Sequence, residues 1–305
     1  MKSTTVRRTT LSIAVVAALA GVAACGSSDS GKGGDKAAGG NPIHVNPIAA
    51  LRSAEQSTQN ADSAKVRATM SVGTAMSMDA TGAFAWGHGL QGDLTITYTG
   101  GKMADAMRKA GSTSVEARYL SDAYYAKMSD KFAQQTGGKH WLRYGYDDMA
   151  KLGGGSGAYL KDQMQNTTPN QSVKMLLASG DVKKAGEETV SGQHTTHYAG
   201  TVNVADLADR TNHNLTASQL ADLKKQLTKA GITTEHVDLW ISDQNLLVKK
   251  VEKADMANGP MVSTAYYSDY GVKVTAAAPP TADTVDFADM MKSAGAASGG
   301  TGTMS

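Results

Sequence analysis

The sequence predicts an α+β fold built on one large antiparallel sheet with a few inserted helices. Most of the chain alternates apolar and polar residues with a period of two, which is typical of strands with one buried face. Polar turns join several of these segments as hairpins, so neighbouring strands should run antiparallel. A chain of 305 residues with 41% hydrophobic residues is long enough to bury a sizeable core.

The N-terminus has the pattern of a signal peptide at residues 1–24. Lys2, Arg7 and Arg8 precede an apolar run of 14 residues, and a membrane-spanning helix needs about 20. The run ends in Val-Ala-Ala-Cys at residues 22–25, which resembles a bacterial lipobox. This resemblance implies cleavage before Cys25 and attachment of a diacylglycerol to its thiol, because a thiolate is a strong nucleophile. The alternative is an ordinary secreted protein with a chance cysteine.

The remaining boundaries follow from composition. Residues 25–41 are rich in glycine and serine and should form a flexible tether. Residues 42–292 should form the folded domain, and residues 293–305 a disordered tail. Cys25 would therefore hold the domain at the outer face of the bacterial cytoplasmic membrane through the tether.

The first half of the domain should start with a helix and continue as strands. Ile48, Leu51 and Ala54 have helical spacing within residues 47–60. Residues 64–72 and 93–100 alternate as strands. Residues 114–129 read as a hairpin that turns at Ser121-Asp122, and residues 140–146 read as one further strand.

The second half alternates between the two types of structure. Short amphipathic helices are expected at residues 157–166 and 170–179, and strands around a turn at Gly192. Thr216 begins a capping box for a helix that should end at Gly231. A hairpin at residues 236–255 and a strand at residues 259–271 complete the domain. The lysine pairs, Lys249 and Lys250 among them, read as solvated faces.

Residues 201–290 carry a family resemblance in the order and spacing of their segments. These segments are Ala-Gly-Thr-Val-Asn-Val at residues 199–204, the capped helix, the hairpin, Tyr-Tyr-Ser-Asp-Tyr-Gly at residues 266–271, and the Pro-Pro break before an acidic, apolar end. Together with the lipobox they resemble actinobacterial lipoproteins of the LppX/LprG type, a branch of the LolA-like fold. The resemblance implies a half-barrel, a strongly curved antiparallel sheet with helices across its concave face. It does not place the glycine-rich segment at residues 153–157.

The resemblance also implies a lipid or glycolipid ligand between sheet and helices, with no cofactor. Such a cavity would be apolar, and the alternating strands supply its candidate lining residues. Each of these residues is also explained by an ordinary packed core. The candidate lining residues are Met70, Val72, Leu94, Ile96, Tyr119 and Leu239.

Other functional classes lack the residues they need. His194 and His197 would point to opposite faces of a strand and could not share a metal ion. Residues 154–158 approach a nucleophile elbow around Ser156 but lack its final glycine. The whole chain has a formal net charge of +2, and three basic residues of the signal peptide supply more than that. The rest is therefore near −1, which gives no support for nucleic-acid binding.

Two functions remain from the sequence. The first is a non-enzymatic, membrane-anchored lipoprotein that binds a lipid or another amphiphile in an apolar cavity, for transport or presentation. The second is a non-catalytic interaction or signalling lipoprotein of the cell envelope, with the same fold and a filled core. An apolar void large enough for an acyl chain would distinguish the first from the second.

Overall fold

The computed structural model describes residues 46–152, 161, 168–203, 221, 225, 228, 231–257 and 259–298. The predicted signal peptide, Cys25 and the tether lie outside the described residues. So do the glycine-rich segment with Ser156 and most of the predicted helix at residues 216–231.

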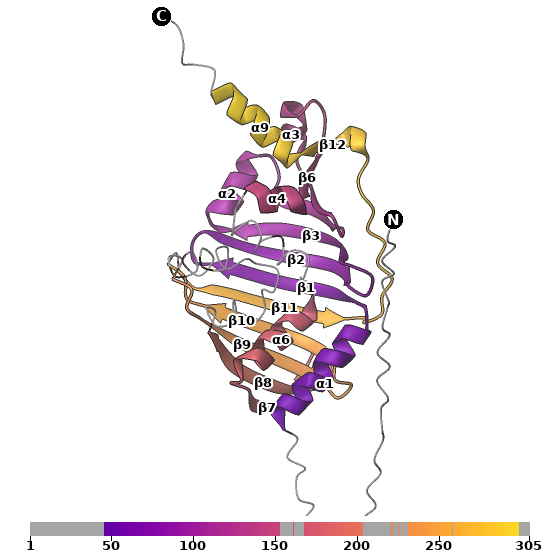
Figure 1. Cartoon of the computed structure of the whole chain (residues 1–305), viewed down its shortest axis with the longest axis vertical. Coiled ribbons are helices and arrows are strands. Elements are labelled where there is room, and N and C mark those ends of the chain that lie inside the picture. The colour runs from indigo at the N-terminus through magenta and orange to yellow at the C-terminus, as the bar shows by residue number, and fades with distance from the viewer. Residues whose placement is uncertain are drawn as a thin grey trace, which may run out of the picture. The chain divides into compact units, whose positions relative to one another are not determined.

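A single sheet of 12 strands forms the body of the described chain (Figure 1). Its spatial order is β12-β6-β5-β4-β3-β2-β1-β11-β10-β9-β8-β7. The strands are β1 (Ser63–Val72), β2 (Met76–Ala85), β3 (Gln91–Gly100), β4 (Ser114–Tyr119), β5 (Ala123–Lys127), β6 (Trp141–Gly145), β7 (Lys183–Val190), β8 (Gln193–Asn203), β9 (Thr234–Ser242), β10 (Leu247–Ala254), β11 (Met261–Ser268) and β12 (Thr284–Asp286).

All strand pairs are antiparallel except β12 with β6, which is parallel. The predicted fold class is therefore confirmed, with one parallel strand added at an edge. The described helices are α1 (Pro47–Asn60), α2 (Gly101–Lys109), α3 (Asp130–Gln135), α4 (Tyr146–Leu152), α6 (Pro169–Ser179) and α9 (Phe287–Ser298).

Helix α1 forms over the predicted residues because its start and its buried face are both encoded locally. The Asn46 side chain accepts a hydrogen bond from the Ile48 amide at 3.0 Å, and Pro47 occupies the first turn. Leu51 and Ala54 are fully buried. The helix prediction at residues 47–60 is thus confirmed.

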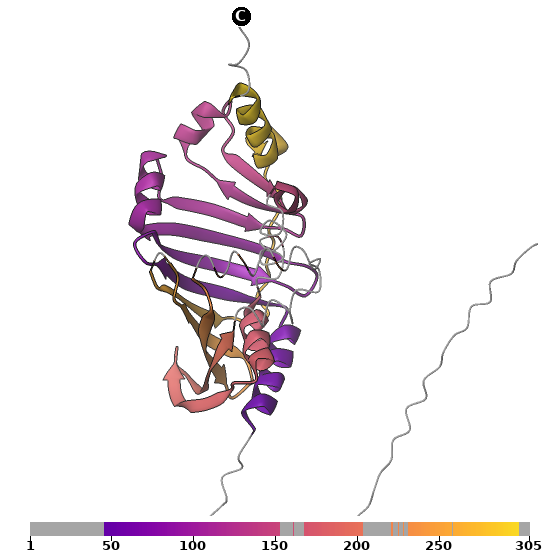
Figure 2. The same ribbon diagram turned by 60° about the vertical axis from the view of Figure 1, so that its left-hand side comes forward.

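Helices α1 and α6 pack against each other and cover one end of the sheet on its concave side (Figure 2). Helix α6 contacts β8, β9 and β10. Leu51 of α1 and Leu176 of α6 share one buried cluster with Leu239 of β9. No described helix other than α1 and α6 contributes a residue to that cluster, which extends across β1–β4.

Strand β2 and helix α2 are absent from the expectations drawn from the sequence. Met76, Met78, Ala80 and Phe84 do alternate toward the concave face, so the signal for β2 was present. Small residues and Gly82 weakened this signal. Gly82 has φ +157°, and a Cβ there would lie 2.0 Å from the Asp93 carbonyl oxygen. Its absent side chain therefore permits the close approach of β3.

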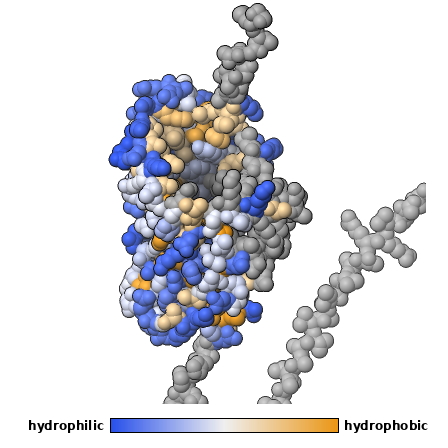
Figure 3. Space-filling model, turned by 90° about the vertical axis from the view of Figure 1, so that its left-hand side faces the viewer, coloured by the Kyte–Doolittle hydropathy of each residue, from blue (hydrophilic) through white to orange (hydrophobic). Residues whose placement is uncertain are grey.

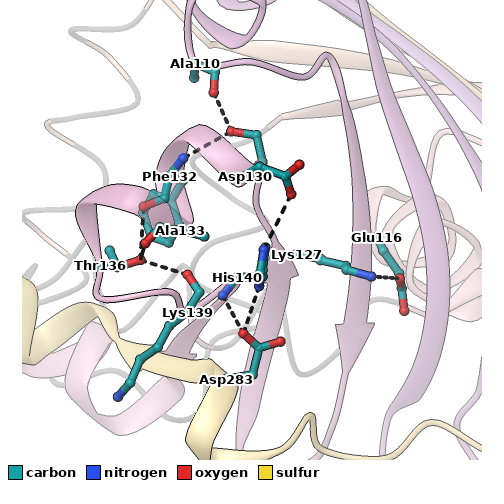
Figure 4. Close-up of polar contacts among 11 residues, drawn as sticks. Ala110, Glu116, Lys127, Asp130, Phe132, Ala133, Thr136, Lys139, His140 and Asp283 are labelled. Carbon is teal, nitrogen blue, oxygen red and sulfur yellow. Dashed lines mark hydrogen bonds and ion pairs between the residues drawn. The ribbon is translucent and has the colours of Figure 1, made fainter.

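The C-terminal segment returns across the molecule to complete the β6 edge of the sheet (Figure 1). Asp283 accepts hydrogen bonds from the His140 amide at 2.7 Å and contacts the His140 ring at 3.0 Å (Figure 4). Arg143 of β6 pairs with Asp286 at 2.6 Å. These polar contacts hold the short strand β12 in place, and α9 follows it and continues to Ser298, beyond Lys292.

Candidate functional site

The candidate site is the concave face of strands β1–β6, which we call the trough. Strand registers place side chains of alternating residues on this face, and most are apolar. Among the described helices, α1 and α6 lie over the other end of the sheet. The trough residues are Val66, Ala68, Met70, Val72, Met78, Ala80, Leu94, Ile96, Tyr119, Tyr124 and Tyr144.

A row of aromatic rings crosses the trough. Phe84 contacts Tyr119 at a ring-centroid distance of 5.1 Å, and Tyr119 contacts Tyr124 at 4.9 Å. The row continues to Tyr144 at 5.7 Å and to Phe287 of α9 at 4.9 Å. Such tilted and edge contacts stabilise an aromatic row beyond its buried area. The C-terminal helix therefore closes the row at the β6 edge.

Burial changes the acidity of the tyrosines in this row. The pKa of Tyr119 is raised to about 12, mainly because burial disfavours its charged form. Burial raises the pKa values of Tyr124 and Tyr144 as well. The trough thus contains neutral hydroxyl groups within an apolar surface.

A space-filling view shows a hollow in the upper part of the molecule, bordered by residues of hydrophobic colour (Figure 3). A curved sheet can leave a hollow of this kind on its concave side. Several trough residues, Met70, Met78 and Ala80 among them, are only half-buried. An apolar hollow of this kind suits an apolar guest.

The six predicted lining residues all lie on the concave face. Met70, Val72 and Tyr119 are half-buried in the trough. Leu94 and Ile96 lie beside them on β3 and are 5% and 8% exposed.

Leu239 is also on the concave face, under α6 in the covered part of the sheet, and is fully buried. Sequence reasoning missed Tyr124, Tyr144 and Phe287 as members of the aromatic row.

The interpretation of Lys250 as a solvated residue is wrong. A β-bulge between Leu247 and Lys249 shifts the phase of β10. The shift turns Val251 to the outer face, where it packs with Trp240, and turns Lys250 and Glu252 to the concave face. Lys250 binds both carboxylate oxygens of Glu252, at 2.9 and 3.0 Å.

The two neighbouring histidines of β8 bind different carboxylates. His194 contacts Asp243 at 2.8 Å, and His197 contacts Asp238 at 2.8 Å and stacks on Trp240 at 4.3 Å. The predicted strand through these residues is confirmed. Within the described residues, no three metal-binding side chains come together. None of the helices in the described part has the length and hydropathy needed to cross a membrane.

Comparisons with known proteins give two relatives of high identity. An uncharacterized 31.2 kDa protein of Streptomyces griseus, from the rplA-rplJ intergenic region, is 54% identical over 84% of this chain and 84% of its own length. A Streptomyces coelicolor protein described as "Putative lipoprotein" is 45% identical over 97% of this chain and 100% of its own length.

Solved structures are more distant, and no family profile matches the sequence. The Mycobacterium tuberculosis lipoprotein LppX is 15% identical, with a TM-score of 0.47 over 75% of this chain and 97% of its own. LprF from Mycobacterium bovis is 16% identical, with a TM-score of 0.45 over 76% of this chain and 96% of its own.

Proposed function

This chain belongs to one family with the two Streptomyces proteins. We propose that it is a lipoprotein of the LppX/LprG type and that it binds a lipid or another amphiphile in the trough. Cys25 would anchor it to the outer face of the cytoplasmic membrane, and the tether would let the domain reach ligands in that membrane. No catalytic step is part of the proposal.

One observation carries the proposal: the trough is apolar, yet α1 and α6 lie over the other end of the sheet. Several apolar side chains of this face, Met70 and Met78 among them, are only half-buried in the described structure, and an apolar concave surface of this kind suits an apolar ligand. Each acyl methylene transferred from water would contribute about 0.8 kcal/mol. The hollow in Figure 3 supports carriage over a filled core.

The test is to recover ligand from the protein and then to block the trough. The full chain carrying Cys25→Ser cannot be acylated, so any lipid that co-purifies with it is bound non-covalently. Native mass spectrometry should detect such a lipid. Repeated recovery of the empty protein, together with no binding of a neutral fluorescent amphiphile, would favour the interaction protein with a filled core.

A matched pair of variants locates the binding surface. Ala80→Phe adds a ring to a half-buried position in the trough, whereas Thr95→Phe adds the same ring to an exposed position on the outer face. We expect Ala80→Phe to weaken amphiphile binding at least tenfold and Thr95→Phe to leave it unchanged. Equal effects of the two variants would place binding elsewhere.

A further inference from the structure

Three ionisable side chains lie on the concave face where the trough meets the part covered by α6. Lys250 and Glu252 come from β10, and Glu235 comes from the neighbouring strand β9. Lys250 lies in register with Ala265 and Leu239, and Glu252 lies in register with Ser263 and Val237. The charges are therefore set within a mostly apolar face, where burying an ion is costly.

Lys250 and Glu252 form an ion pair that compensates the charge of each. The Lys250 ammonium donates to both oxygens of Glu252 and, at 2.9 Å, to the Ser172 hydroxyl of α6. These bonds use all three of its hydrogens. The Ser172 hydroxyl donates in turn to Glu252. The side chains of Lys250 and Glu252 are only 17% and 13% exposed.

Glu235 is different, because no described residue forms a hydrogen bond or an ion pair with its carboxyl group. Burial and, to a smaller extent, the nearby Glu252 carboxylate raise the pKa of Glu235 to about 7, although Lys250 acts in the opposite direction. Tyr267 of β11 faces the Lys250–Glu252 pair. A half-buried carboxyl that none of the described side chains engages is available to a ligand.

We propose that this cluster binds the polar end of the ligand, and that this end is a hydrogen-bond donor without negative charge, a hydroxyl or an ammonium group. The inference rests on the proposed function and adds the chemical class of the head group. Two carboxyl groups surround one lysine whose hydrogens are already used. An anionic head group would therefore meet repulsion, whereas a donor would meet free acceptor oxygens.

The sheet also provides a path for the apolar end of such a ligand. Ala265, Ala68, Ala80 and Ile96 follow Lys250 in register across β11, β1, β2 and β3. The three alanines have small side chains, and the path ends at Ile96 in the trough. From β10 to β3 it crosses four strand spacings of about 4.8 Å, roughly 19 Å, which suits a long acyl chain.

The experiment compares three probes with the same saturated chain: a fatty alcohol, a fatty amine and a fatty acid. Each displaces a neutral fluorescent amphiphile from the full chain carrying Cys25→Ser at pH 8. We expect the alcohol and the amine to bind at least tenfold more tightly than the acid. Adding Glu235→Gln should remove most of the preference for the amine. The matched control is Glu187→Gln, an exposed glutamate on β7.

The dependence on pH separates the two donor classes. Binding of the amine should strengthen as the pH rises through about 7, because deprotonated Glu235 attracts it. Binding of the alcohol should change little. Equal binding of all three probes, or an unchanged order in Glu235→Gln, would overturn the head-group inference and leave the proposed function intact. Binding of none of them would overturn both.

Discussion

Replacing Lys250 with methionine tests whether the charged cluster of the concave face is buried as described. The substitution leaves Glu252, which is 13% exposed, without its cation. Removing one partner of a buried ion pair typically costs about 3–5 kcal/mol, because the remaining charge is desolvated and unpaired. Both partners keep some contact with water, so we expect a loss near the lower end, about 3 kcal/mol. That is a large share of the roughly 5–15 kcal/mol that stabilises a typical protein.

The double variant Lys250→Met/Glu252→Leu distinguishes an unpaired charge from lost packing. Apolar side chains of similar volume often replace a buried ion pair without loss, so the double variant should recover most of the stability. Lys253→Met is the control, because Lys253 is exposed on the other face of β10.

The measurement is guanidinium denaturation of the full chain with Cys25→Ser, followed by far-ultraviolet circular dichroism. A loss below about 1 kcal/mol for Lys250→Met would refute the reasoning, as would a double variant no more stable than the single one.

Two further predictions concern close packing and the sheet edge. A Cβ at Gly200 would lie 1.7 Å from the Asp181 carbonyl oxygen, so Gly200→Ala should destabilise the protein by at least about 1–3 kcal/mol. A Cβ at Gly186 would have no atom within 4 Å, so Gly186→Ala should leave the denaturation midpoint of the protein nearly unchanged. Hydrogen bonds from His140 lower the pKa of Asp283 in the folded protein. The Asp283 carboxylate therefore stabilises the fold fully above its unfolded pKa of about 3.9, and this stabilisation is lost as the pH falls below about 3.9 toward the folded pKa. Hydrogen exchange should show that protection of the β12 amides declines on acidification. Asp283→Ala should lower this protection already at neutral pH. Unchanged protection in the variant would show that Asp283 does not hold β12.

Much of the fold could be predicted from local pattern. Alternation assigned Met70, Leu94 and Tyr119 to one face of their strands, because side-chain direction in a strand has a fixed period of two. The helical spacing of Ile48, Leu51 and Ala54 predicted α1 over residues 47–60. The hairpins of β4–β5 and β9–β10 followed from polar turns between alternating segments. The family resemblance supplied the expectation of a curved sheet, and the chain belongs to one family with the two Streptomyces relatives.

The rest depends on contacts between residues far apart in the chain. The pairing of β1 with β11 joins Val66 to Tyr267, and β12 reaches β6 from the other end of the sequence. The secondary-structure propensity of a segment does not indicate which distant segment it will pair with.

The bulge in β10 is the clearest case. Two lysines in an alternating strand predict a solvated face, yet one extra residue before Lys249 reverses the faces that follow. The sequence by itself predicted which side chains share one face of each strand, because alternation fixes their direction. Only the tertiary structure decided that Lys250, Glu252 and Glu235 lie within that apolar face, because a bulge and its strand partners set their direction.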